Sequence, residues 1–115
     1  MEEINGATPK ASNESGRVLF CNELEDGIQQ IIKDVNLTRQ TCPLQKLKDV
    51  REALTEMLKT PVKGQSATQR IMEIRTGLES LMIVIDGLMR MSKSKQLNSL
   101  RTSMVLWIKR IDAEL

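Results

Sequence analysis

The chain has no histidine and no tyrosine among its 115 residues, and its aromatic side chains are limited to Phe20 and Trp107. The lack of histidine removes the commonest metal ligand, the usual general base and the side chain that titrates near neutral pH. Carboxylates are plentiful, but none belongs to a recognisable acid–base or nucleophile motif. We therefore expect a protein that is not an enzyme and that holds no metal and no cofactor.

Long apolar runs are also missing from the chain. Nothing approaches the roughly 20 apolar residues of a membrane span, and no apolar leader follows Met1. Both absences predict an intracellular protein that does not associate with membranes. Cys21 and Cys42 cannot form a zinc site unaided. A disulfide between them is the alternative to free thiols, and a reducing compartment favours free, structural thiols.

What the sequence does contain is aliphatic side chains at helical spacing. Aromatic residues make up only 2% of the chain, against 40% for all hydrophobic residues, and this balance favours helices over a β-sandwich. Within residues 77–91, the five residues from Leu81 to Ile85 are all apolar. On a helix they point in every direction, so that helix must be covered on most sides. We predict an all-α fold, a small bundle of four or five helices packed around this central helix.

Residues 1–17 are polar and hold almost no apolar side chain. They bury too little surface to offset the entropy of ordering, so we predict a disordered N-terminal tail followed by a helical bundle domain at residues 18–115. The first helix is expected to begin near Asn22, a good N-cap, and to end near Asn36. The second is expected to begin near Pro43, which suits a first helical turn.

The C-terminal half contains the remaining predicted helices. Ser66 to Gln69 form a capping-box pattern, which opens either one helix over residues 67–91 or two shorter helices that meet at Gly77. We favour a break at Gly77 because a domain of this size rarely contains so long a helix. After a polar connection at Ser92 to Lys95, the final helix carries apolar residues at spacings of three and four: Leu97, Leu100, Met104, Trp107 and Ile111. This spacing indicates packing within a bundle, with Trp107 in the core.

Basic residues are concentrated near the C-terminus. No acidic residue lies between Asp86 and Asp112, and this interval carries a charge of +6, so the rest of the chain carries −4. Three interpretations remain open: a solvated helix face, a docking surface for an acidic partner, and a nucleic-acid surface. The last is disfavoured because neither aromatic residue is placed as a stacking platform. Asp86 itself is expected at a helix edge or bonded to a neighbouring Arg or Lys, rather than in catalysis.

Two threonines directly precede prolines, Thr8 before Pro9 and Thr60 before Pro61. Both match the pattern of proline-directed phosphorylation and lie in predicted loops. A phosphate at Thr60 would follow a helix C-terminus, where negative charge is unfavourable. Thr8 and Thr60 are therefore candidate phosphorylation sites.

From Ala53 onward the layout of these segments resembles the N-terminal helical domain of transcription elongation factor TFIIS and its relatives, which include the integrase-binding domain of lens-epithelium-derived growth factor. The family pattern has a helix ending in an apolar-proline step, a short helix, a Gly-opened helix, a polar connection and a last helix with an apolar–Trp pair. The corresponding segments are Leu54 to Pro61, Ile71 to Arg75, Gly77 to Met91, Ser92 to Ser94, and Leu106-Trp107.

This resemblance implies a scaffold in nuclear transcription complexes that binds short motifs combining acidic residues with a bulky apolar anchor. It implies a binding surface at the interhelix segments 37–41 and 90–95, where cations meet the acids and apolar side chains seat the anchor. The predicted protein-binding residues are the apolar Leu37 and Met91 and the cations Arg90, Lys93, Lys95 and Arg101.

We therefore predict a non-enzymatic interaction module that binds an acidic–hydrophobic peptide or a partner helix, in the nucleus rather than the cytoplasm. The alternative is a structural bundle that self-associates into a homo-oligomer through the Leu81 to Ile85 surface, as in oligomerisation domains of viral phosphoproteins or cell-division complexes. A nucleic-acid-binding helical domain is the third hypothesis.

Overall fold

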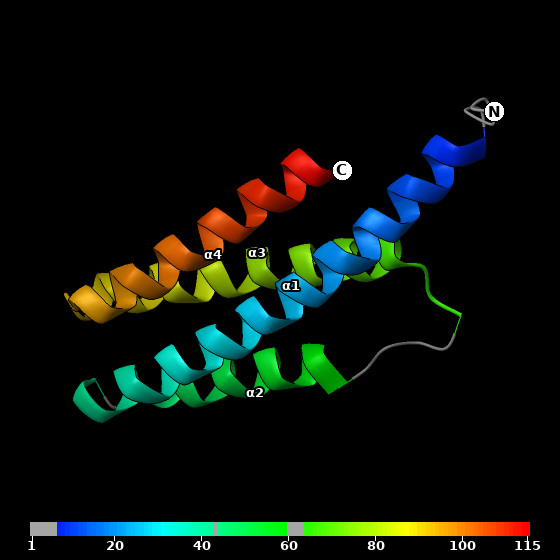
Figure 1. Ribbon diagram of the computed structural model, residues 1–115. Coiled ribbons are helices and arrows are strands. Elements are labelled where there is room, and N and C mark those ends of the chain that lie inside the picture. Colours follow the sequence, from blue (N-terminus) through cyan, green and yellow to red (C-terminus); the bar gives the residue numbers. More distant parts are fainter. Residues whose placement is uncertain (1–6, 43, 60–63) are drawn as a thin grey trace.

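The computed structural model describes residues 7–42, 44–59 and 64–115, with side chains described from residue 16 onward. The described residues form four α-helices and no strand, which confirms the all-α bundle (Figure 1). The helices are α1 (Ala7–Thr41), α2 (Gln45–Lys59), α3 (Ala67–Met91) and α4 (Lys95–Glu114). The molecule measures 59 × 25 × 19 Å because α1 alone is about 52 Å long at 1.5 Å per residue.

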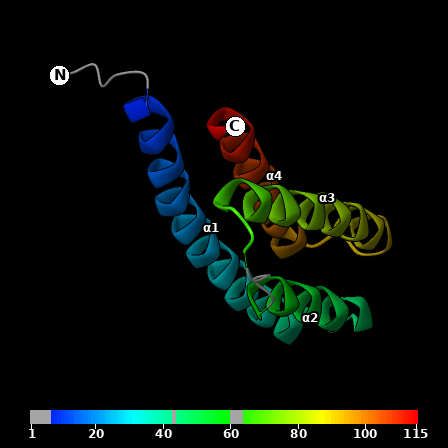
Figure 2. The same cartoon turned by 90° about the vertical axis from the view of Figure 1, so that its right-hand side faces the viewer.

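Consecutive helices run antiparallel in an up-and-down arrangement (Figures 1 and 2). α1 and α3 each contact all three other helices, whereas α2 and α4 do not contact each other within the described chain. The α1–α2 and α3–α4 connections lie at the same end of the bundle, where the Cys42 sulfur is 3.7 Å from the Ser92 hydroxyl oxygen. We call this end, formed by residues 36–42, 44–48 and 88–98, the turn end. At the opposite end, the first turns of α1 extend beyond the other helices.

The first helix begins at Ala7, much earlier than its expected start at Asn22. Asn22 instead lies within the helix and is exposed. Pro9 stands in the first turn, where backbone N–H groups have no helical partner and a proline is tolerated. Residues 1–6 of the expected tail lie outside the described residues, and the boundary between tail and bundle at residue 18 stays a prediction.

α1 also continues past Asn36, its expected end, to Thr41. Thr38 and Cys42 extend its buried stripe and are only 2% and 9% exposed. The Thr38 hydroxyl donates to the Asp34 carbonyl oxygen at 2.7 Å, so this buried polar group is satisfied within the helix. A polar segment therefore remains helical because part of it packs in the core.

The predicted capping box at Ser66 is confirmed, and a second helix is present as expected. α2 ends at Lys59 and buries Leu47, Val50 and Leu54, while Pro43, its expected start, lies outside the described residues. At the start of α3, the Gln69 backbone N–H donates to the Ser66 hydroxyl at 3.1 Å, and the Ser66 backbone N–H donates to the Gln69 side-chain oxygen at 3.1 Å. At the start of α4, the Ser94 hydroxyl accepts from the Leu97 N–H at 3.4 Å. These caps satisfy orphan donors locally, which is why they are readable from the sequence.

α3 is one continuous helix of 25 residues, so the break favoured at Gly77 is wrong. Gly77 faces α2, and a Cβ at this position would lie 2.8 Å from the Cε atom of Met57. The glycine therefore permits a close approach of two helices, and this packing offsets its low helix propensity. The short helix at Ile71 to Arg75 that the TFIIS-like layout implies is part of α3 rather than a separate element.

The buried side chains follow one another at intervals of three and four residues. In α3 they are Ile71, Ile74, Leu78, Leu81, Ile85 and Leu88. This spacing packs neighbouring helices with interlocking side chains along one narrow seam. Within the central apolar run, Leu81 and Ile85 are 7% and 0% exposed, but Ile83 is 73% exposed. The prediction that the run is covered on most sides is therefore wrong at Ile83.

Gly27 and Trp107 join α1 to α4 near the end opposite the turn end. A Cβ at Gly27 would overlap the Trp107 ring, so the indole packs directly on the helix backbone. Trp107 is half-buried against the core, and its ring centroid lies 6.3 Å from that of Phe20. The Arg110 guanidinium lies 4.5 Å from the Trp107 centroid and covers its outer side. Trp107 thus closes the core rather than lying fully inside it.

Both cysteines are free and buried, as predicted. Cys21 lies in α1 and Cys42 directly follows it, so they are about 31 Å apart along the helix axis, too far for a disulfide. Burial raises the pKa of the Cys21 thiol, the Glu25 carboxylate raises it further, and Arg70 opposes both effects. A raised pKa keeps the thiol protonated at neutral pH, as is typical of a structural cysteine.

Among the described residues, no helix combines the length and apolar character needed to cross a membrane.

We predict that Gly27→Ala lowers the free energy of unfolding by about 1–3 kcal/mol, because the added methyl group displaces the Trp107 ring. The matched control is Gly87→Ala in α3, where nothing lies within 4 Å of the added methyl group. That variant is expected to gain about 0.5–1 kcal/mol from helix propensity. Urea unfolding at low protein concentration, followed by circular dichroism, measures both. Equal stabilisation of the two variants would show that the glycine–indole contact is absent.

Candidate functional site

The turn end gathers cations from every helix. Residues 35–48 and 87–111 contain no acidic side chain, and the antiparallel topology brings the first of these segments beside the first part of the second, up to about residue 98, at this end (Figure 1). The cations placed there are Arg39, Lys46, Lys48, Arg90, Lys93 and Lys95. Arg39 is half-buried and the other five are exposed. The turn end therefore combines three cations of the positive interval near the C-terminus, Arg90, Lys93 and Lys95, with three cations from residues 39–48.

None of these six cations forms an ion pair within the described part of the chain. Three arginines near the opposite end differ, because each contacts a carboxylate on another helix. These contacts are Arg70–Glu25 at 3.4 Å, Arg75–Asp112 at 2.7 Å and Arg110–Glu23 at 2.8 Å. The hydrogen bonds from Arg75 hold the pKa of Asp112 below its ordinary value. Arg70, Arg75 and Arg110 thus have carboxylate partners near one end of the bundle, whereas the six cations of the turn end have none among the described residues.

A groove between α1 and α4 combines this charge with an exposed apolar side chain. It has a volume of about 370 Å³, and its lining residues are Asp34, Leu37, Thr38, Lys95, Gln96, Ser99 and Leu100. Leu37 is 60% exposed at the groove, whereas Leu100 is buried beneath it. Two predicted binding residues, Leu37 and Lys95, therefore meet although they are far apart in the sequence.

Lys95 also lines a second groove, at the α3–α4 connection. This groove has a volume of about 650 Å³, and its lining residues are Met89, Ser92, Lys93, Ser94, Lys95, Asn98 and Ser99. The connection is held by Ser94, which caps α4, and by the contact between Ser92 and Cys42. Lys93 and Lys95 consequently project from a fixed turn, with Lys95 standing between the two grooves.

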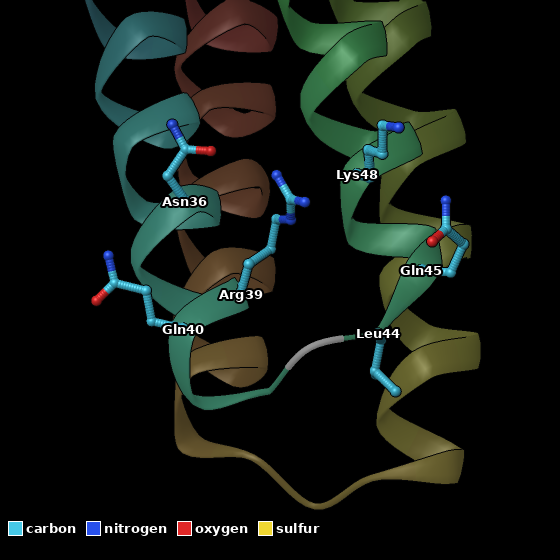
Figure 3. Close-up of a pocket in the computed structure, with 6 residues that line it drawn as sticks. All are labelled: Asn36, Arg39, Gln40, Leu44, Gln45 and Lys48. Carbon is cyan, nitrogen blue, oxygen red and sulfur yellow. The ribbon is translucent and has the colours of Figure 1, made fainter.

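A third hollow opens between the end of α1 and the start of α2 (Figure 3). Its lining residues are Asn36, Arg39, Gln40, Leu44, Gln45 and Lys48. Arg39 reaches from α1 toward the gap, and Lys48 lies on the α2 side. The sequence interpretation missed both cations. The signal was present, because residues 35–48 lack acids just as residues 87–111 do.

The other predicted binding residues lie outside these hollows. Met91 is 75% exposed and Arg90 is exposed at the end of α3, close to the α3–α4 connection. Arg101 differs, because its Nε donates to the Asp86 carboxylate at 2.6 Å and links α4 to α3. Asp86 therefore has the structural role expected of it, and the charge of Arg101 is compensated within the chain.

Of the two candidate phosphorylation sites, Thr8 lies in a helix and not in the loop predicted for it. Thr8 lies in the first turn of α1 and its side chain is not described, while Thr60 lies outside the described residues. Among the described side chains, no three His, Cys, Asp or Glu residues gather in a cluster that would hold a metal ion.

Comparison with known protein families, with curated proteins and with solved structures finds no match to this chain.

We predict that Arg101→Gln has little effect on binding of acidic peptides, because Asp86 already compensates this charge. The half-exposed ion pair contributes less than about 1 kcal/mol to the free energy of unfolding. Lys95→Gln makes the same change in net charge at a cation that has no internal partner, so it is expected to weaken binding. Fluorescence anisotropy with a labelled acidic peptide compares the two variants, and equal losses would show that only net charge matters.

Proposed function

We propose that this protein is a non-enzymatic interaction module whose turn end binds a segment combining acidic residues with an apolar anchor. One observation carries the proposal: six cations at the turn end have no ion-pair partner among the described residues, and one of them, Lys95, lines a groove together with the exposed Leu37. A protein gains nothing in stability from unpaired like charges at one end, since they repel one another. An acidic partner compensates them.

The anchor fits the groove between α1 and α4. Leu37 and the buried Leu100 supply apolar contact there, while Asp34 and Ser99 leave the edge of the groove polar. Lys95 lines the same groove, where it can form an ion pair with an acidic residue next to the anchor. Apolar contact slows dissociation, while the surrounding cations speed association and select against basic partners.

Other turn-end cations can bind further acidic residues of the partner, besides the one next to the anchor. Lys93 lies at the neighbouring groove, and Arg39 and Lys48 lie on the other side of α1. Acids on either side of an anchor therefore meet cations in both directions. Nucleic acid fits less well, because Trp107 and Phe20 pack against each other beside Arg110 and offer no stacking surface beside the turn-end cations. The setting in nuclear transcription complexes rests on the resemblance to TFIIS-type domains and stays a prediction.

We predict that the double variant Lys93→Glu, Lys95→Glu lowers affinity for an acidic peptide with one leucine or phenylalanine anchor by at least about tenfold. The physical reason is that two attractive charges become repulsive at the groove edges. Affinity of the unmodified chain should also fall as salt rises, because these charges are exposed. Isothermal titration calorimetry measures both effects.

The matched control is Lys59→Glu, Lys109→Glu, which makes the same change in net charge at exposed positions away from the turn end. It is expected to retain most of the affinity. Equal loss in both double variants would indicate non-specific attraction and contradict a site at the turn end. Tighter, steeply salt-dependent binding of DNA or RNA would favour the nucleic-acid hypothesis instead.

We also predict that Leu37→Gln weakens binding of the anchored peptide without lowering the unfolding temperature, because Leu37 is already 60% exposed. A peptide in which glycine replaces the anchor should bind the variant and the unmodified chain equally. Leu106→Gln serves as the control, since Leu106 is 56% exposed on α4 and lines none of the three hollows. If Leu37→Gln binds the anchored peptide as well as Leu106→Gln does, the anchor is seated elsewhere.

A further inference from the structure

The outer face of α3 presents a protruding apolar side chain beside a depression. Ile83 is 73% exposed in the middle of the helix. Gly87 lies one turn later on the same face, and nothing lies within 4 Å of a Cβ at that position. Ile83 belongs to the most apolar segment of the chain, yet no other helix covers it. This face differs from the turn-end surface in being neutral at its centre.

Opposite charges flank this apolar centre on one side of the helix. Glu79 and Arg90 are eleven residues apart, which is three helical turns, so they lie on the same edge of the face. The Glu79 side chain is 51% exposed and contacts Arg75 at 2.9 Å. Arg75 is also bonded to Asp112, so Glu79 retains acceptor capacity for a second cation. Arg90 has no ion-pair partner among the described residues.

The positions of these four residues are self-complementary. When two identical helices pack antiparallel about a two-fold axis, residues equally far on either side of the axis face each other. The midpoint between Ile83 and Gly87 is position 85. The midpoint between Glu79 and Arg90 lies only half a residue from it. One axis therefore places each Ile83 against the Gly87 of the second copy. The same axis places each Glu79 beside the Arg90 of the second copy.

We propose that two copies of this chain associate through the outer faces of α3 in an antiparallel, two-fold symmetric dimer. The hydrophobic contact is Ile83 packed into the space over the opposing Gly87, and two reciprocal Glu79–Arg90 ion pairs set the register. Asp86 lies near the axis, but Arg101 neutralises it within each chain. One helix from each chain forms an interface below the standard size, so the dimer is a weak, concentration-dependent one. The dimer does not depend on the turn end binding an acidic partner.

Analytical ultracentrifugation of the full chain, from about 1 to 500 µM, tests the association itself. The unmodified chain is expected to shift from monomer to dimer over this range. Ile83→Gln removes the apolar contact without changing charge and should weaken dimerisation at least tenfold. Leu106→Gln, the matched control on α4, should leave it unchanged. Gly87→Leu fills the receiving space and should also weaken dimerisation, while its unfolding temperature at low concentration stays the same or rises.

A charge-exchange experiment tests the antiparallel register. Glu79→Arg and Arg90→Glu should each dimerise less than the unmodified chain, because like charges then face each other across the axis. An equal mixture of the two variants should form a heterodimer, since both ion pairs are restored, one in the original orientation and one reversed. No acidic partner is present in this assay, so a role of Arg90 at the turn end does not affect the result.

Three results would overturn the proposal. A chain that stays monomeric at the highest concentration does not use this face for self-association. A dimer that is unchanged in both Ile83→Gln and Gly87→Leu forms through another surface. A mixture of Glu79→Arg and Arg90→Glu that associates no better than either variant alone rules out the antiparallel pairing.

Discussion

The structure depends on one constraint: each helix can bury only a narrow stripe of its side chains. Core side chains recur at alternating intervals of three and four residues, so each helix turns one stripe inward and leaves its other faces to solvent. Because no helix is enclosed on all sides, even the most apolar segment keeps Ile83 at the surface. The cations of the turn end lack acidic partners for a separate reason, because residues 35–48 and 87–98 contain no acidic side chain. One candidate interaction surface therefore follows from the bundle's geometry and the other from the distribution of acids along the chain.

Parts of the fold that are set by local interactions were predictable from the sequence. The stripe of α2 and the cap at Ser66 depend on residues within two turns of one another. The continuity of α3 was not predictable, because the reason for Gly77 lies in the contact with Met57 on another helix. The end of α1 was missed for a related reason. A polar residue such as Thr38 reads as a connection until its burial against the core is known.

The candidate site likewise has one part that could be predicted from the sequence and another that depends on the fold. Charge is a property of the sequence, so the acid-free interval that contains Lys93 and Lys95 could be identified directly. Its extension to Arg39 and Lys48 could not be placed, since those residues reach the same end only through the antiparallel path of the chain. The sequence also did not show which cations form ion pairs within the chain. Arg101 belongs to the basic interval, but its charge is compensated by Asp86. Sequence analysis finds the charges, and the fold decides which of them remain available.

Arg90 connects the two surfaces, because it lies at the turn end and also at the edge of the outer face of α3. In the antiparallel dimer its guanidinium faces a glutamate of the second copy, which removes one cation from each turn end. An acidic partner that engages Arg90 must therefore disfavour dimerisation, and dimerisation must lower the affinity for that partner by the same factor. The two turn ends lie about 24 Å apart along the α3 helices, on either side of the two-fold axis near the middle of the dimer. A partner that contacts only Lys93 and Lys95 escapes this competition and can occupy both.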